Sequence, residues 1–384
     1  MCRSRLSYFN AQPNIATEYR AAASLHSHTH HSKESLQFIP QFAEKYPLLK
    51  WALDRWCKTA AIRVDFERAY WTPPLDAEMS LRVEKDQIEQ KLGRASFVSL
   101  TDHDTIEAPL LLRAMPETKD VPISLEWSAP YGGTLFHFGI HNLPDKCAQS
   151  SVANLAHYTK NPSEKELYQL LAALNEFPDV LVVFNHPLWD QCEVGQNLHE
   201  QAVRQFMETG GQFVHAVEIN ATRVWSENDR AREMAEQWKL PSVAGGDRHG
   251  CDPSSALNLT NANSFSELVN EIRYAQRSHV LMMPQYDEPR CILIMQMLLD
   301  VIREYPEHPF GSRRWDNRVF HPGRKTPEDT PVSALWGRPP VFLEILFSSL
   351  RLLEYTAVKN ALKQAMPRET MERVATDVSY EASS

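Results

Sequence analysis

Short apolar segments, most of them followed by His, Asp or Glu, constrain this sequence more than any other feature. They lie between about residues 95 and 280 and alternate with stretches of helical periodicity, as in βαβ units. We expect buried strands at FVSLTDH, VPISLEW, DVLVVFNH, HAVEIN and SVAGGD. Because α/β barrels and open parallel sheets carry their sites at the carboxyl ends of the strands, this alternation predicts one site there.

Two helices between these strands can be predicted from their ends. Asn161 is the expected N-cap of a helix that follows it, with Pro162 in the first turn and leucines along one face. Ser264 and Glu267 have the spacing of a capping box, which predicts a second helix after the strand that ends at Asp247.

A histidine-rich stretch, residues 24–31, holds the first candidate ligands. His26 and His28 are two residues apart, so their side chains point the same way if the segment is extended. Two imidazoles on one face could bind one metal ion. Taken alone, a polar surface cluster explains this pattern better.

Four further clusters favour a metal site over a polar surface cluster, because each one places an imidazole or carboxylate at or near the end of an apolar strand. Imidazole and carboxylate donors without thiolates suit Zn, Mn, Fe or Co. The residues concerned are His103 with its flanking Asp102 and Asp104, Glu126 with His137 eleven residues later, His186, and the pair Asp247 and His249.

The ordered set SLHSHTHHS, SLTDHD, SLEW, FNHP and GGDRHG resembles the polymerase and histidinol phosphatase (PHP) superfamily over about residues 24–251. The resemblance implies a distorted seven-stranded (β/α)7 barrel of the α/β class, with two or three metal ions at its mouth, and phosphate ester hydrolysis. It implies these metal ligands: His26, His28, His103, Glu126 as a bridging carboxylate, His137, His186, Asp247 and His249.

The first motif departs from the family pattern at two places. Ser24 stands where family members usually have Asp, and Lys33 and Glu34 stand where a later Asp or His ligand is expected. A protonated lysine has no lone pair to donate, so we take Glu34 as the further candidate ligand.

The chemistry that such a centre supports is hydrolysis. Divalent metal ions lower the pKa of bound water toward about 7, and paired ions can hold the phosphoryl oxygens. Asp247, His249 or His186 could relay a proton to the leaving oxygen. Arg248 and Arg223 are candidates for binding phosphate.

Three functions remain open at this point. The first is a metal-dependent phosphoesterase that acts on a small metabolite or nucleotide, or on short oligonucleotides. The second is hydrolysis of C–N or C–O bonds, as in related amidohydrolase-like barrels. The third is a non-catalytic metal-binding PHP domain, against which the near-complete ligand set counts.

The chain divides by pattern into a metal-dependent hydrolase barrel at 20–280, a helical insertion at 37–95 within it, and a mainly helical C-terminal extension at 281–384. Because the insertion leaves and re-enters at neighbouring strand ends, we expect a lid that governs substrate choice. Its aromatic residues could cover a substrate or form the insertion's own small core, and three of its arginines could meet phosphate: Phe38, Phe42, Tyr46, Trp51, Trp56, Phe66, Tyr70 and Trp71, with Arg55, Arg63 and Arg68. The C-terminal helices are candidates for oligomer contacts.

Composition excludes several classes of protein. With 40 basic and 49 acidic residues the net charge is −9, which argues against a protein that coats nucleic acid or binds a membrane surface. No apolar run approaches the ~20 residues that span a bilayer. The first residues lack a secretory leader and the six cysteines form no C-x-x-C pair, so we expect a cytoplasmic protein with reduced thiols.

Overall fold

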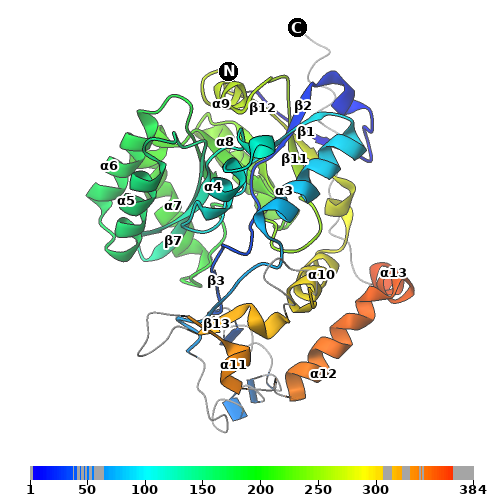
Figure 1. Cartoon of the computed structure of the whole chain (residues 1–384). Helices are drawn as coiled ribbons and strands as arrows, with labels where there is room; N and C mark the ends of the chain where they lie inside the picture. The colour runs from blue at the N-terminus through cyan, green and yellow to red at the C-terminus, as the bar shows by residue number, and fades with distance from the viewer. Residues whose placement is uncertain are drawn as a thin grey trace.

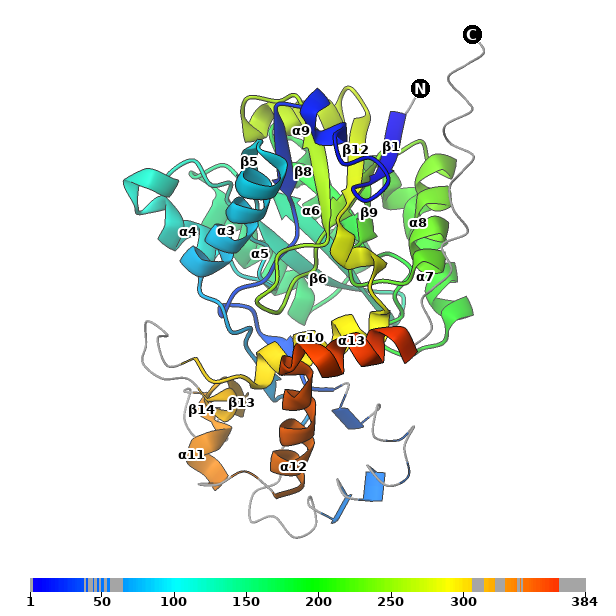
Figure 2. The ribbon, with the colours of Figure 1, turned by 90° about the vertical axis from the view of Figure 1, so that its right-hand side faces the viewer.

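The computed structural model describes residues 3–37, 39–40, 65–305, 314–321, 329–336, 339 and 341–365, with residues 44, 47, 50–51 and 54–55. The architecture is α/β. Two five-stranded sheets form the body of the molecule, and helices cover their outer faces (Figure 1). A smaller sheet and four C-terminal helices lie at one end of this body (Figure 2).

The first large sheet has the strand order β1-β12-β11-β2-β5 and the second has the order β10-β9-β8-β7-β6. Parallel and antiparallel neighbours occur in both. Their strands are β1 (Arg3–Tyr8), β2 (Ala21–Ser24), β5 (Ala95–Val98), β6 (Leu125–Tyr131), β7 (Thr134–His141), β8 (Leu181–Asn185), β9 (Ala216–Asn220), β10 (Ser242–Gly245), β11 (Ala256–Thr260) and β12 (Arg277–Met282).

The prediction of a closed (β/α)7 barrel is wrong. Among the described residues, the two sheets are connected by the isolated bridges Ser27 to Arg248 and His103 to Glu126, without a continuous strand ladder around a ring. The alternation of apolar segments correctly located β5, β6, β8, β9 and β10. It could not give strand direction, and β11 runs antiparallel to both of its neighbours.

A hairpin is the clearest departure from βαβ order. β6 and β7 pair antiparallel from Leu125 with Ile140 to Tyr131 with Thr134, and the turn between them is Gly132-Gly133. Both glycines have positive φ, 58° and 84°, as the tight turns that match the twist of a hairpin require. No helix intervenes, so β7, which is not among the expected strands, lies beside β6 and runs in the opposite direction.

The helices around the sheets bury one face each. They are α3 (Ala77–Asp86) with the following π-helix Gln87–Leu92, α4 (Glu107–Arg113), α5 (Ala148–Lys160), α6 (Glu164–Asn175), α7 (Gln196–Gly210), α8 (Trp225–Gln237) and α9 (Phe265–Arg273). Ser264 caps α9 as predicted, by accepting from the Glu267 amide. Asn161 instead ends α5, and Ser163 precedes α6.

The largest core cluster is aromatic and lies between the second sheet and the helices α5 to α7. A second cluster joins both sheets, because Ala23 of β2 and Val183 of β8 pack with Leu268 and Val269 of α9. α9 therefore closes one end of the space between the sheets. The opposite end, where β2, β8 and β10 finish, is the end that faces the C-terminal elements (Figure 1).

That end carries a four-stranded sheet drawn from distant parts of the chain. Its order is β14-β13-β4-β3, with β3 (Glu34–Ser35), β4 (Tyr70–Trp71), β13 (Val319–His321) and β14 (Thr330–Pro331). The neighbouring helices are α10 (Arg290–Ile302), α11 (Val332–Trp336), α12 (Val341–Leu350) and α13 (Thr356–Ala365). Shorter helical turns lie at Ile15–Glu18, Pro116–Thr118, Gly211–Phe213, Pro284–Asp287, Trp315–Asn317 and Arg351–Glu354.

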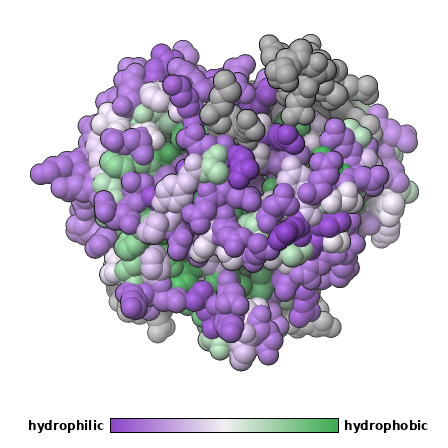
Figure 3. Space-filling view, turned by 90° about the horizontal axis from the view of Figure 1, so that it is seen from above, coloured by the Kyte–Doolittle hydropathy of each residue, from purple (hydrophilic) through white to green (hydrophobic). Residues whose placement is uncertain are grey.

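Several residues of the expected lid, namely Phe38, Phe42, Tyr46, Trp56 and Arg63, lie outside the described residues. The division of the chain into three parts stays a prediction. In the described part of the chain, no helix is long and apolar enough to cross a membrane. Seen from the α9 end, the surface is mainly hydrophilic, with hydrophobic residues in scattered patches (Figure 3).

A buried histidine makes the stability of this fold depend on pH. His215 accepts a hydrogen bond from the Val182 amide at Nδ1 (2.9 Å), and its Nε2 lies 2.9 Å from the Asn175 Oδ1 atom, so a second proton would break the first bond. Burial, followed by the charge of Arg273, lowers the pKa of His215 to about 3. The unfolded chain therefore binds more protons than the native chain between about pH 6.5 and 3.

We expect the stability from His215 to be complete above pH 6.5 and to fall by at most about 1.4 kcal/mol per pH unit on acidification. His215→Asn should lower the free energy of unfolding at pH 7 but make its decline from pH 6.5 to 4 shallower. Urea titrations at several pH values measure both effects, with the exposed His157→Asn as control. Parallel profiles for wild type and His215→Asn would contradict the assignment.

Candidate metal centre

Nine side chains converge at the end of the two sheets that faces the C-terminal elements. They form overlapping groups whose donor atoms lie within 4.8 Å of one another inside each group. All nine are candidates that the sequence predicts: His26, His28, Glu34, His103, Glu126, His137, His186, Asp247 and His249. The groups share members, so they make one continuous centre.

His26 and His28 follow β2 in the extended segment that the sequence predicts. Their Nε2 atoms are 3.1 Å apart, and both side chains are buried. The chain beyond them is fixed by Asp102, which accepts from the Thr29 amide (2.5 Å) and from the Thr29 hydroxyl (2.7 Å). Two imidazoles are thereby held with their donor atoms directed at the same space.

Glu126, on β6, lies at the middle of the centre. Its Oε2 atom is 3.0 Å from His26 Nε2, 3.3 Å from His28 Nε2 and 3.4 Å from His103 Nδ1. Despite these distances, Glu126 Oε2 and His103 Nδ1 are buried and have no hydrogen-bond partner among the described residues. A buried carboxylate oxygen without a partner is costly unless a cation satisfies it.

The other oxygen of Glu126, Oε1, faces a second group of imidazoles. Oε1 lies 3.1 Å from His186 Nε2 and 3.5 Å from His137 Nδ1, and it accepts from the Asn185 side chain at 3.0 Å. The two oxygens of one carboxylate thus face different sets of imidazoles. This is the arrangement that a bridging carboxylate requires.

Glu34, on β3 of the small sheet, belongs to a third group of potential metal ligands. Its oxygens lie 3.2 Å from His249 Nε2 and 3.5 Å from His103 Nε2, and the ring of His249 stacks on that of His28 with centroids 4.1 Å apart. Ser32 donates to Glu34 at 2.6 Å. Glu34 reaches this position because β3 pairs with β4, not because it follows a strand of the large sheets.

Asp247 completes the group around the first two histidines. Its Oδ1 atom is 3.5 Å from His28 Nε2 and 3.8 Å from His26 Nε2, while Oδ2 accepts from Asn220 and Thr222. Asp247 has a φ of 47°, a left-handed conformation that is unusual for a residue other than glycine. Such strain occurs where function holds a side chain in place.

A buried carboxylate that we did not predict orients the first histidine. Glu218 Oε1 lies 2.6 Å from His26 Nδ1, which leaves His26 Nε2 to face the centre. Its Oε2 atom accepts from the His186 amide and from the Asn220 side chain, both at 2.9 Å. Partners of this kind fix the tautomer and orientation of metal-binding histidines.

Gly245, on the neighbouring strand β10, leaves the space that Glu218 occupies. A Cβ atom at this position would lie 1.5 Å from Glu218 Oε1. The sequence does hold a signal for this residue, since Glu218 interrupts the apolar strand HAVEIN. A carboxylate inside a buried strand is rarely without a partner.

The charges in the centre depend on one another. Burial disfavours a charge on His26, but Glu126, Glu218 and Asp247 raise its pKa well above the usual value. Burial likewise opposes the charge of Glu126, but His26, His103 and His137 lower its pKa well below the usual value. The pKa of His137, in contrast, is lowered well below the usual value, chiefly by burial.

The donor set fits divalent metal ions. Ligand atoms about 2.0–2.2 Å from a tetrahedral ion lie about 3.3–3.6 Å from one another, close to the separations around Glu126. Imidazole and carboxylate donors suit zinc, manganese, iron and cobalt. These buried His, Glu and Asp groups could therefore hold metal ions.

The structure places the two candidate arginines differently. Arg248 is buried and ion-paired with Glu84 (Nε to Oε1, 2.8 Å), and it also donates to the Gly250 carbonyl. Most of its guanidinium is thus occupied by the protein, so its contact with phosphate stays a prediction. Arg223 lies nearer the centre, with Nη2 3.9 Å from Asp247 Oδ2.

Aromatic rings border the centre on two sides. Trp189 packs edge-on against His137 and His186, with centroids 6.3 and 5.1 Å apart. Trp71, of the expected lid, lies 5.9 Å from the ring of His249. Of the other lid residues, Trp51 is exposed, and Arg55 lies over its ring.

No family model and no curated protein matches this sequence. Membership of the PHP superfamily therefore stays a prediction. Solved structures that resemble the chain include PsfC from Pseudomonas syringae, with 14% identity and a TM-score of 0.38 over 58% of this chain and 89% of that one.

Two others are an amidohydrolase from Chromobacterium violaceum and a proposed metal-dependent phosphoesterase from Bifidobacterium adolescentis. The first has 12% identity and a TM-score of 0.31, over 46% of this chain and 83% of that one. The second has 13% identity and a TM-score of 0.31, over 52% and 91%. These values are too low to transfer an activity, so the assignment of function rests on the site itself.

The contact between Glu218 and His26 gives a prediction about metal affinity. Glu218→Ala should weaken metal binding by about 10- to 100-fold, because His26 loses the partner that holds its tautomer. Gly245→Ala should do the same by displacing the Glu218 carboxylate. Metal content after dialysis and calorimetric titration measure the loss. The exposed Glu233→Ala is the matched control, and unchanged affinity in both site variants would show that Glu218 only fills space.

Proposed function

We propose that this protein is a metal-dependent hydrolase that cleaves phosphate esters. The observation that carries the proposal is Glu126, whose two oxygens face separate sets of imidazoles in one buried centre. Two or three divalent ions, of manganese, zinc, iron or cobalt, would be held by the nine clustered residues. Such ions supply activated water near neutral pH and positive charge for the phosphoryl oxygens.

The residues of the chain have distinct tasks in this proposal. We call His26, His28, Glu126 and Asp247 the inner group of ligands. Glu218 keeps His26 Nε2 directed into this group. His137 and His186 face the second oxygen of Glu126. The third group comprises His28, Glu34, His103 and His249.

Proton transfer to the leaving oxygen is assigned among Asp247, His186 and His249. Of these three, His249 also lines a pocket beside the centre, so it is the best placed to hold a proton where a leaving group would lie. Its Nδ1 atom is 3.0 Å from the Asp247 carbonyl, which orients the ring.

The pocket supports a small substrate over a long one. Its volume is about 340 Å³, within the range of small-molecule sites. Arg223 gives the side nearest Asp247 a positive charge, which favours an anionic ester over a neutral amide. A small phosphorylated metabolite or nucleotide is therefore the preferred substrate class, with a short oligonucleotide as the alternative.

The first test is metal dependence. Elemental analysis should find two or three transition metal ions per chain, and a chelator should abolish release of phosphate from phenyl phosphate. The same protein should be assayed on a phosphodiester, a dinucleotide and an N-acyl amide. Hydrolysis of the amide alone would replace the proposal with C–N bond hydrolysis, and bound metal without any hydrolysis would indicate a non-catalytic domain.

A second test compares neighbouring histidines. His28→Ala should lower kcat/KM by more than the about 10- to 100-fold typical of residues that only orient a ligand. His30→Ala should retain activity, because His30 lies outside the groups of potential ligands. Glu126→Ala and Asp247→Ala should resemble His28→Ala, and circular dichroism checks the fold of each variant. Equal losses at His28 and His30 would contradict the assignment of the centre.

A further inference from the structure

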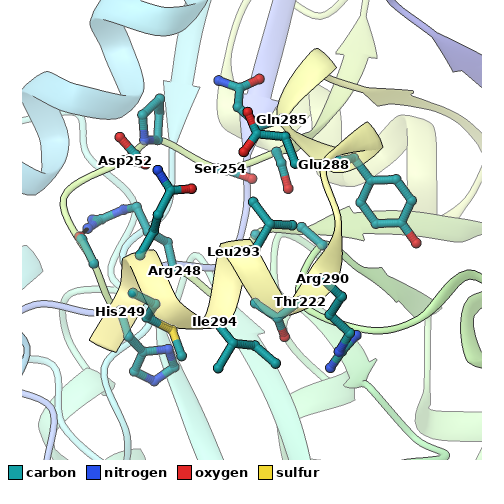
Figure 4. Close-up of a pocket in the computed structure, with 18 of the residues that line it drawn as sticks. Thr222, Arg248, His249, Asp252, Ser254, Gln285, Glu288, Arg290, Leu293 and Ile294 are labelled. Atoms are coloured by element: carbon teal, nitrogen blue, oxygen red, sulfur yellow. Dashed lines mark hydrogen bonds between the residues drawn. The ribbon is translucent and has the colours of Figure 1, made fainter. Parts of the chain in front are cut away.

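The pocket beside the metal centre has a wall from the C-terminal part of the chain. α10 contributes Arg290, Leu293 and Ile294, while the opposite side comes from the segments after β9 and β10 (Figure 4). Helix α10 lies outside the stretch of metal-ligand motifs. Its residues can therefore select a substrate without taking part in the metal centre.

Arg223 is held at the junction of the pocket and the metal centre. Its guanidinium lies over the ring of Trp189, 3.7 Å from the centroid. The carboxylates of Asp247 and Glu227 are 3.9 and 4.0 Å away, beyond hydrogen-bonding distance. The Nε atom of Arg223 is buried without a hydrogen-bond partner among the described residues.

Arg290 brings a second positive charge to the same place. It is the first residue of α10, and Figure 4 shows it beside Thr222. The Arg290 side chain makes no ion pair or hydrogen bond within the described part of the chain. Its charge is close enough to act on Arg223: burial lowers the pKa of Arg223, Asp247 and Glu227 oppose that shift, and Arg290 adds to it. A positive side chain at the positive end of a helix is unfavourable unless an anion is present.

Most of the acidic residues that line the pocket have partners other than Arg290. Glu288 pairs with Lys363, Asp287 accepts from Asn10, and Asp300 accepts from the Cys251 amide. Asp252 lies on the side of the pocket opposite to Arg290 (Figure 4). Arg223 therefore has only Asp247 and Glu227 as close carboxylates among the described residues, while the Arg290 side chain lines the cavity without an ion pair of its own.

We propose that Arg223 and Arg290 form an anion-binding subsite, so that the substrate carries a second anionic group besides the phosphate that reacts. This inference rests on the proposed function, because it takes the metal centre as the place of the reacting group. Arg290 is then a specificity-determining residue, supplied by the C-terminal part of the chain. Guanidinium groups bind phosphate and carboxylate in the same forked geometry, so the shared chemistry is an anionic oxygen group.

Binding of non-hydrolysable compounds tests this subsite without any need for catalysis. Phosphonoacetate, 3-phosphonopropionate and 4-phosphonobenzoate place a carboxylate at three distances from a phosphonate. In calorimetric titrations, the full-length protein should bind at least one of them about tenfold or more tightly than its methyl ester, the gain expected from a charge-assisted ion pair.

The variants assign that preference to Arg290. Arg290→Gln should abolish the preference for the carboxylate, Arg290→Lys should retain part of it, and the exposed Arg204→Gln should leave it unchanged. Equal binding of acids and methyl esters by the wild type would overturn the subsite, as would a preference that survives Arg290→Gln. An equal loss for acids and esters would also overturn it, by placing Arg290 on the reacting phosphate.

Kinetics separate failure of this inference from failure of the proposed function. With phenyl phosphate and 4-carboxyphenyl phosphate, the subsite predicts a lower KM for the second ester, and Arg290→Gln should remove that difference. If both esters are hydrolysed with the same KM, the subsite is wrong and the phosphoesterase stands. If neither is hydrolysed but the phosphonate preference depends on Arg290, the subsite stands and the phosphoesterase fails.

Discussion

The burial of Glu126 among imidazoles is the constraint on which the rest of this structure depends. A carboxylate with no exposed surface is stable only if positive charge and hydrogen bonds compensate its lost hydration. Strands of both sheets bring that compensation, with His26 following β2 and His186 following β8. The left-handed backbone at His186 and Asp247, and the absence of a side chain at Gly245, help to place the groups that surround Glu126.

Much of this centre could be predicted from the sequence, because side chains at strand ends meet wherever the strands share a sheet edge. All nine candidate ligands lie in one cluster. Glu218 was missed, since it lies within a strand and touches His26 rather than the cluster interior. The ion pair of Arg248 with Glu84 was also beyond the sequence, because α3 is 164 residues away in the chain.

The fold was harder to predict than the site. Apolar periodicity located five strands of the two large sheets, but it carries no information on direction or partner. A two-glycine turn converts β6 and β7 into a hairpin, and the chain pairs β11 antiparallel between β2 and β12. The ligands still converge, because the carboxyl ends of β2, β8 and β10 face the same way whether or not the sheets close into a ring.

The small four-stranded sheet gives the centre an order of assembly. Glu34 sits on β3, which pairs with β4, which in turn pairs with β13 near residue 320. As the chain leaves the ribosome, the donors around Glu126 are all available once His249 has emerged. The strand β13, which pairs with β4 on the side away from Glu34, is made some seventy residues later. A nascent chain can therefore acquire the inner part of its centre first, and the group that includes Glu34 is secured only when the last quarter of the protein has been synthesised.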